Sequence, residues 1–248
     1  MIQRYTIAAV THRGRVRRNN EDHFAVDGAI YGGSMGAPVS FESASADHTL
    51  LVADGMGGHA AGELASRIAL EALLGWPEAL TKVEACASAL FAANDRIYDE
   101  MKCNHDTVGM GTTIIGAVMS SRHLLFFNVG DSRLYRHRRA CLTRLSEDDV
   151  PAFVESGSFR TSHEITQALG GHSVHAPILP HIGVGPTIES GDSLLLCSDG
   201  LTDMVSESII CNLLDALPET ADCVCELLQI ALSSGGSDNI TIIVLRVT

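Results

Sequence analysis

Two apolar segments of the chain each end in an aspartate that is followed by a glycine. They are LLVADG at residues 50–55 and LLLCSDG at residues 194–200. Short, strongly apolar runs predict buried strands, which hold the next side chain at a fixed place. We expect the glycine to let the backbone turn sharply and to leave room for a carbonyl group to approach an ion. Each Asp-Gly taken alone is more commonly a simple tight turn, so the pair is informative only together with other carboxylates.

Carboxylates also stand at the boundaries of other predicted elements. These residues are Glu21, Asp22, Asp131, Asp203 and Asp238. Hard cations such as Mg²⁺ and Mn²⁺ take oxygen ligands, and carboxylates from separate strand ends can bridge two such ions. Arg17 lies shortly before Glu21, and its planar guanidinium is suited to binding two phosphate oxygens. For Arg13, Arg15 and Arg18 beside it, a solvated basic loop is the plainer interpretation.

Hydrophobic patterning predicts strands, two helices, several strands, two more helices and a final strand. The predicted strands cover residues 4–10, 49–53, 112–120, 123–129, 133–137, 193–198 and 240–247. The predicted helices cover residues 62–75, 81–101, 209–217 and 219–232, with Ser206 as a candidate cap of the third. Residues 28–45 are expected to form a hairpin tip or flexible loop, and residues 142–185 a less regular stretch. Because this order lacks a regular βαβ alternation, it predicts antiparallel sheets covered by helices.

The composition limits the partners that the chain can have. It has 248 residues, of which 46% are hydrophobic, and a formal net charge of −13. An acidic surface repels nucleic acid and anionic membranes, and no apolar run approaches the roughly 20 residues that span a bilayer. The 7 cysteines form no CxxC pair, which argues against a zinc ribbon or a disulfide framework. We therefore expect a cytoplasmic protein with no membrane insertion and no nucleic-acid partner.

Six segments, in order along nearly the whole chain, resemble the motifs of the PP2C (PPM) protein phosphatases in their bacterial form. They are GRVRRNNED at 14–22, VADGMGGH at 52–59, GTT at 111–113, NVGDSR at 128–133, CSDGLTD at 197–203 and SDNIT at 237–241. The resemblance implies an α+β fold, a four-layer α-β-β-α sandwich of two packed antiparallel sheets flanked by helix pairs. It also implies that residues 1–248 form a single phosphatase domain.

A centre with two Mn²⁺ or Mg²⁺ ions, and a third, weaker ion in bacterial members, follows from the same resemblance. The metal ligands that it implies are Glu21, Asp22, Asp54, Gly55, Asp131, Asp199, Asp203 and Asp238. Asp54 would bridge the two main ions, the carbonyl group of Gly55 would bind one of them, and Asp199 and Asp238 would complete the other.

The remaining ligands have narrower expected roles. Glu21 and Asp22 would bind metal directly or through water. Asp131 and Asp203, together with Asp199, match the positions that bind the third ion.

The expected reaction is hydrolysis of phosphoserine or phosphothreonine by a metal-activated water, without a covalent enzyme intermediate. Arg17 would hold the phosphate, and it forms the expected catalytic set with Asp22 and Asp54. The expected partners are phosphorylated proteins, either the substrates of a serine/threonine kinase or the kinase itself. The leaving-group proton could come from a metal-bound water or from His59, for which a structural or solvent role is the plainer interpretation.

The resemblance is weakest between residues 142 and 170. There LTR at 142–144 is followed by LSEDD, and the family pattern resumes with ITQALG at 165–170, so the flap over this stretch is expected to be short. Since this region shapes access to the site, substrate specificity does not follow from the family. The compact form resembles phosphatases that oppose a serine/threonine kinase in bacterial type VI secretion, by analogy alone.

Three other functions compete with this interpretation. A catalytically silent family member could act as a regulatory or phosphoprotein-binding module, but the chain retains Arg17 and every expected metal-site carboxylate, and such clustered charges are costly. A two-metal phosphodiesterase or nuclease is disfavoured by the net charge of −13 and the lack of an aromatic-basic stripe. A nucleotide-binding kinase is disfavoured because the chain has no GK[ST] loop.

Overall fold

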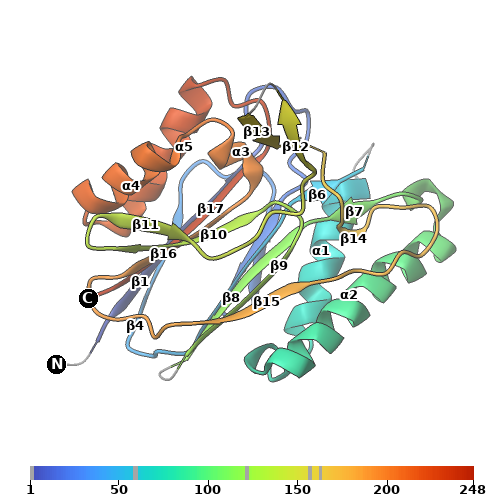
Figure 1. The fold of residues 1–248 in the computed structure, drawn as a ribbon, viewed down its shortest axis with the longest axis horizontal. Helices are drawn as coiled ribbons and strands as arrows, with labels where there is room; N and C mark the ends of the chain where they lie inside the picture. Colours follow the sequence, from blue (N-terminus) through green and yellow to red (C-terminus); the bar gives the residue numbers. More distant parts are fainter. Residues whose placement is uncertain (1–2, 58–60, 121–122, 156–157, 162–163) are drawn as a thin grey trace.

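Two antiparallel six-stranded sheets form the centre of the computed structural model, which describes residues 3–57, 61–120, 123–155, 158–161 and 164–248 (Figure 1). In spatial order, the first sheet consists of β11 (Cys141–Arg144), β10 (Arg133–Arg138), β16 (Ser193–Cys197), β17 (Ile240–Val247), β1 (Tyr5–His12) and β4 (Val39–Ser43). The second consists of β15 (His181–Gly185), β9 (Leu124–Val129), β8 (Ile114–Met119), β5 (His48–Ala53), β2 (His23–Val26) and β3 (Ala29–Gly32).

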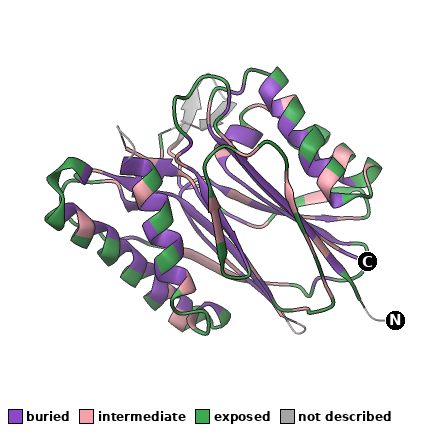
Figure 2. Ribbon diagram, turned by 180° about the vertical axis from the view of Figure 1, so that it is seen from behind, coloured by how far each residue is buried: buried purple, intermediate pink, exposed green. Residues whose placement is uncertain are grey.

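The central strands are apolar throughout because both of their faces are buried. In β5, Leu50 and Val52 point into the core between the two sheets, whereas Leu51 and Ala53 point toward the helices. Successive side chains of a strand face opposite sides, so a strand covered on both sides reads as a continuous apolar run. Figure 2 shows the result, with the central strands almost wholly buried and the helices exposed along their outer faces.

A pair of helices covers the outer face of each sheet. Helices α1 (Ala61–Leu74) and α2 (Val83–Cys103) pack on the second sheet, and α4 (Glu207–Ala216) and α5 (Thr220–Ser233) pack on the first. The smaller elements are η1 (Ala79–Thr81), η2 (His105–Thr107), α3 (Asp199–Thr202), the sheet of β6 (Gly55–Met56), β7 (Gly111–Thr112) and β14 (Leu169–Gly170), and the hairpin of β12 (Ala152–Glu155) and β13 (Ser158–Thr161). The predicted α+β fold, with two packed antiparallel sheets flanked by helix pairs, is confirmed.

Two local predictions are wrong. Residues 28–45 are not a single loop, because β3 and β4 lie in this segment and form edge strands of different sheets. Residues 142–185, predicted to be less regular, contain short strands between irregular segments. Edge strands are half-exposed and lack the apolar runs on which the predictions depended. Ser206 stands before α4 without capping it through its side chain, because its hydroxyl bonds the hydroxyl of Ser208 at 2.9 Å instead.

No helix in the described part of the chain is both long enough and apolar enough to cross a membrane.

Candidate metal centre

Asp54 is held at the end of β5 by two threonines of the neighbouring segment. Its backbone oxygen accepts hydrogen bonds from the Thr113 amide and the Thr112 hydroxyl, both at 2.9 Å. Its backbone amide donates to the Thr113 hydroxyl at 3.2 Å. After Asp54 the chain continues in an extended form as β6, which pairs with β7. The GTT segment therefore fixes the backbone of Asp54 from both sides.

Asp199 follows β16, in the other sheet, and begins the short helix α3. The amide of Asp203 donates to the backbone oxygen of Asp199 at 2.8 Å, as expected one helical turn later. This turn explains why two carboxylates four residues apart both line the same cavity. The sequence predicted a strand that ends at Asp199 but gave no sign of the helix.

Neither Gly55 nor Gly200 has a positive φ, so neither glycine is needed for a left-handed backbone conformation. Close packing explains both glycines. A Cβ on Gly55 would lie 2.2 Å from the backbone oxygen of Gly62 and 2.5 Å from that of Glu21. A Cβ on Gly200 would lie 1.9 Å from the backbone oxygen of Asn239. The glycines are therefore required because other backbone segments pass directly against them.

Asp22 does not line the cavity and is fully buried. Its Oδ2 accepts hydrogen bonds from the Ser198 hydroxyl at 2.9 Å and the Thr241 hydroxyl at 2.7 Å. Ser198 follows β16 and Thr241 lies in β17, so both donors come from the side of the first sheet. Asp22 thus connects the ends of the two sheets through hydrogen bonds that cross the sandwich.

Asp238 precedes β17 and pairs with Arg17. The Nη2 atom of Arg17 lies 2.5 Å from Oδ2 of Asp238, and the amide of Asn239 donates to Oδ1 at 2.8 Å. The side chain of Asn239 also accepts a hydrogen bond from the amide of Glu21 at 2.8 Å. Asn239 therefore positions two of the predicted ligands. Sequence reasoning missed this role, although its place beside Asp238 in the SDN segment was a signal.

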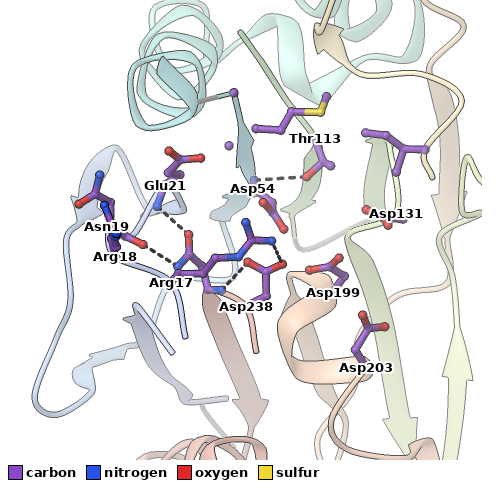
Figure 3. A pocket seen from close by; sticks show the side chains of 15 residues that line it. Arg17, Arg18, Asn19, Glu21, Asp54, Thr113, Asp131, Asp199, Asp203 and Asp238 are labelled. Atoms are coloured by element: carbon purple, nitrogen blue, oxygen red, sulfur yellow. Dashed lines mark hydrogen bonds and ion pairs between the residues drawn. The ribbon is translucent and has the colours of Figure 1, made fainter. Parts of the chain in front are cut away.

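One cavity of about 890 Å³ brings these side chains together (Figure 3). Of the nine predicted site residues, all except Asp22 line it; they are Arg17, Glu21, Asp54, Gly55, Asp131, Asp199, Asp203 and Asp238. Arg18, Asn19, Thr113 and Ile165 also contribute to its wall. In Figure 3 the arginines and Asn19 lie on one side of the cavity, and Asp131 and Asp203 on the opposite side. His59 lies outside the described residues.

Burial and neighbouring charges raise the pKa of the carboxyl groups of Asp22, Asp54 and Asp199. Burial and the carboxylates of Asp131 and Asp238 raise the pKa of Asp199 to about 8. Burial raises the pKa of Asp22 to about 6, although its hydrogen bonds oppose this shift. Burial, and then the charges of Asp22 and Asp199, also raise the pKa of Asp54. So much buried negative charge calls for a compensating cation.

Two buried oxygens test whether a cation suits this site. Oδ1 of Asp22 and Oδ1 of Asp199 have no hydrogen-bond partner among the described residues. Buried acceptors of this kind are rare in folded proteins, and carboxylate oxygens are the ligands that Mn²⁺ and Mg²⁺ prefer. The donor set therefore fits a divalent cation. The carboxylates are spread along the cavity, and no three acidic, histidine or cysteine side chains of the described segments form a closed cage.

The combination of a two-sheet sandwich and a carboxylate-lined cavity defines a class that includes bacterial serine/threonine phosphatases of known structure. The catalytic domain of PstP, solved with two manganese ions, is 32% identical, with a TM-score of 0.77 and 99% of each chain covered. PppA, described as a key regulatory component of type VI secretion in Pseudomonas aeruginosa, is 29% identical, with a TM-score of 0.76 and 98% of each chain covered.

The chain belongs to the protein phosphatase 2C family, whose model matches residues 39–238. The serine/threonine protein phosphatase PstP of Mycobacterium tuberculosis is 35% identical over 98% of this chain, which spans only 45% of that relative. The serine/threonine phosphatase stp of Listeria monocytogenes is 33% identical over 95% of this chain and 93% of its own length. The predicted family is thereby confirmed.

Proposed function

We propose that this protein is a metal-dependent serine/threonine phosphatase that hydrolyses phosphoserine and phosphothreonine in phosphorylated proteins. One observation carries the proposal. Carboxylates from the ends of both sheets line a single cavity, and the guanidinium of Arg17 stands among them. Family membership and the names of the relatives support the same activity.

The proposed metal ligands are those that the family resemblance implies, and their shared position around one cavity supports them. Asp54, at the end of β5, is assigned as the bridging ligand, with the carbonyl group of Gly55 beside it. Asp199 and Asp238 complete the second position. When bound, two Mn²⁺ or Mg²⁺ ions would supply Lewis acidity and lower the pKa of a water molecule.

Glu21 and Asp22 would support this centre from the side of β2. The buried Oδ1 of Asp22 has no donor in the described structure, whereas Oδ2 already accepts two hydrogen bonds. We therefore assign Oδ1 of Asp22 as the atom that would bind a metal ion, directly or through water. Asp131 and Asp203, with Asp199, are assigned to a third and weaker ion on the far side of the cavity.

Arg17 is assigned to the substrate phosphate. Its side chain is 57% exposed, so the guanidinium can turn toward an incoming phosphate. The fork of an arginine binds two phosphate oxygens at once and neutralises charge that develops on them.

The wider setting of the enzyme is also a proposal. Residues 1–248 are taken as one phosphatase domain, with residues 142–170 as a short flap beside the cavity, which Ile165 lines. The cysteines are free, and Cys103, Cys141 and Cys225 are exposed, which suits the reducing cytoplasm. The partners would be phosphoproteins that a serine/threonine kinase produces, or such a kinase itself.

The test is release of phosphate from a phosphothreonine peptide with Mn²⁺, with Mg²⁺ or with EDTA. We expect release with either metal, none with EDTA, and severe losses in Asp54→Asn and Asp199→Asn. Asp106→Asn, an exposed aspartate in η2, is the matched control. Metal-independent binding of the peptide without release would support a silent module instead. Cleavage of bis(p-nitrophenyl) phosphate but not of the peptide would support a phosphodiesterase.

A further inference from the structure

The loop before β2 concentrates positive charge at the edge of the acidic cavity. Residues 13–18 contain four of the 17 basic residues of a chain whose net charge is −13. Their side chains are Arg13, Arg15, Arg17 and Arg18, and all four residues are exposed. Basic residues this dense on such an acidic protein attract anions locally while the rest of the surface repels them.

This loop is held in place by its backbone. The side-chain amide of Asn239 donates to the backbone oxygens of Arg13 at 3.0 Å and Asn19 at 2.9 Å, at the two ends of the loop. The amide of Arg15 donates to the backbone oxygen of Gly236 at 2.8 Å. Gly14 has a φ of +76°, and a Cβ there would lie 2.1 Å from the backbone oxygen of Asp238. The loop is therefore fixed directly against the metal-site segment.

Two of the four arginines are already engaged within the protein. Arg17 pairs with Asp238, and Arg13 donates to the backbone oxygen of Arg18 at 3.5 Å. The side chains of Arg15 and Arg18 make no hydrogen bond or ion pair with another described residue. Arg18 lines the cavity and lies on the side opposite Asp131 and Asp203 (Figure 3). Arg18 therefore remains available to a ligand that enters the cavity, and Arg15 lies exposed in the same loop without lining the cavity itself.

We propose that Arg15 and Arg18 form an anion-binding edge that selects substrates with a second anionic group near the phosphorylated residue. This inference rests on the proposed phosphatase function. In an extended peptide, the side chain two residues away lies about 7 Å along and on the same face as the phosphorylated one. If Arg17 holds the phosphate, a carboxylate or second phosphate at that distance can reach the adjacent arginines.

The rest of the cavity wall offers no competing basic side chain. Among the described residues that line the cavity, only Arg17 and Arg18 are basic. A substrate with an acidic flank is therefore oriented with that flank toward the arginine loop. Each exposed charge pair contributes modestly, so two arginines are expected to change kcat/KM by about three- to tenfold.

The experiment compares phosphothreonine peptides with alanine, aspartate or phosphoserine two residues before or after the phosphothreonine. We expect wild type to prefer an anionic flank by about three- to tenfold in kcat/KM, less so at high salt. Arg15→Gln/Arg18→Gln should lose the preference of kcat/KM for the anionic peptides over the alanine peptide, and Arg15→Lys/Arg18→Lys should restore much of it. Arg96→Gln, an exposed arginine of α2, should leave the preference unchanged.

The outcomes separate this inference from the function on which it rests. No hydrolysis of the alanine peptide with Mn²⁺ would overturn the phosphatase proposal itself. Hydrolysis without a preference, or a preference that survives the double glutamine substitution, would overturn the arginine edge alone. A preference for the doubly phosphorylated peptides only would identify the second anion as a phosphate, and an equal preference for aspartate would identify it as any anion. Fluorescence anisotropy of the same peptides in EDTA gives the ratio of Kd values without turnover.

Discussion

The two Asp-Gly steps of the cavity look alike in sequence but follow different backbone paths. After Asp54 the chain continues as β6 and pairs with β7, whereas Asp199 opens the helical turn of α3. What they share is a glycine pressed against another backbone segment. The comparison teaches that the glycine is required in both steps for close approach of two chain segments, whichever path the backbone then follows.

The two steps also differ in how firmly the aspartate is held. The backbone of Asp54 has three hydrogen bonds with Thr112 and Thr113, inside a sheet. Asp199 starts a four-residue helix whose closing bond comes from Asp203. We call the part of the centre at the ends of the second sheet the Asp54 half and the part at the ends of the first sheet the Asp199 half. We regard the Asp54 half as the rigid part and the Asp199 half as the more adjustable one.

The largest difference is expected when the two aspartates are exchanged for asparagine. Asp54→Asn should lower kcat/KM by more than about 10³-fold and Asp199→Asn by about 10²-fold, since Asp54 is the proposed ligand of both ions. Steady-state kinetics on a phosphothreonine peptide with saturating Mn²⁺ measures both effects. Equal losses, or a larger loss for Asp199→Asn, would contradict a bridging role for Asp54.

Adding a methyl group at either glycine is the next test. Gly55→Ala and Gly200→Ala should each lower the free energy of unfolding by about 1–3 kcal/mol, because the new Cβ would collide with backbone oxygens. Urea unfolding measures this loss. Gly36→Ala is the matched control, since its Cβ would meet nothing within 4 Å. If both variants were as stable as the control, packing would not explain the glycines.

Much of the fold could be predicted because its central strands are apolar on both faces. The last strand was predicted at 240–247 and found at Ile240–Val247, and the strand predicted at 49–53 was found at His48–Ala53. The edge strands β3 and β4 escaped prediction because solvent covers part of each, so their polar residues resemble those of a loop.

The site was predictable in its membership but not in its construction. Ordered motifs pointed to Asp54, Asp199 and Asp238, and these residues do line one cavity. The sequence could not show that Asn239 connects Glu21 to the arginine loop, because these partners are more than two hundred residues away along the chain. Nor could it show the packing at Gly55 and Gly200, which depends on segments that only the tertiary fold brings close.

Asn239 lies in the Asp199 half, and the effect of its hydrogen bonds to Glu21, Arg13 and Asn19 can be tested separately. Asn239→Ala should lower the free energy of unfolding by about 2 kcal/mol, since it leaves the Glu21 amide and two backbone oxygens without their partner. It should also raise KM for phosphopeptides, because the arginine loop loses its attachment. The matched change in the Asp54 half is Ser66→Ala. The hydroxyl of Ser66 donates to the backbone oxygen of Glu21 at 2.6 Å. An unchanged KM in Asn239→Ala would show that the attachment of the arginine loop does not contribute to substrate binding.

The smallest expected effect is a pH dependence in the Asp54 half. His23, beside Asp22, is buried and bonds the Ser66 hydroxyl at 2.9 Å, and burial, assisted by Arg67, lowers its pKa to about 4. Between this value and the ordinary 6.5, the unfolded chain binds more protons than the folded one, so stability falls as the pH falls through this window. The contribution of His23 should decrease by about 1 kcal/mol between pH 7 and pH 5.5. Urea unfolding of wild type and His23→Asn at both pH values isolates it, because the other titrating groups are common to both proteins. The same pH dependence of the free energy of unfolding in the two proteins would contradict this, and would show that His23 is not held neutral in the folded protein.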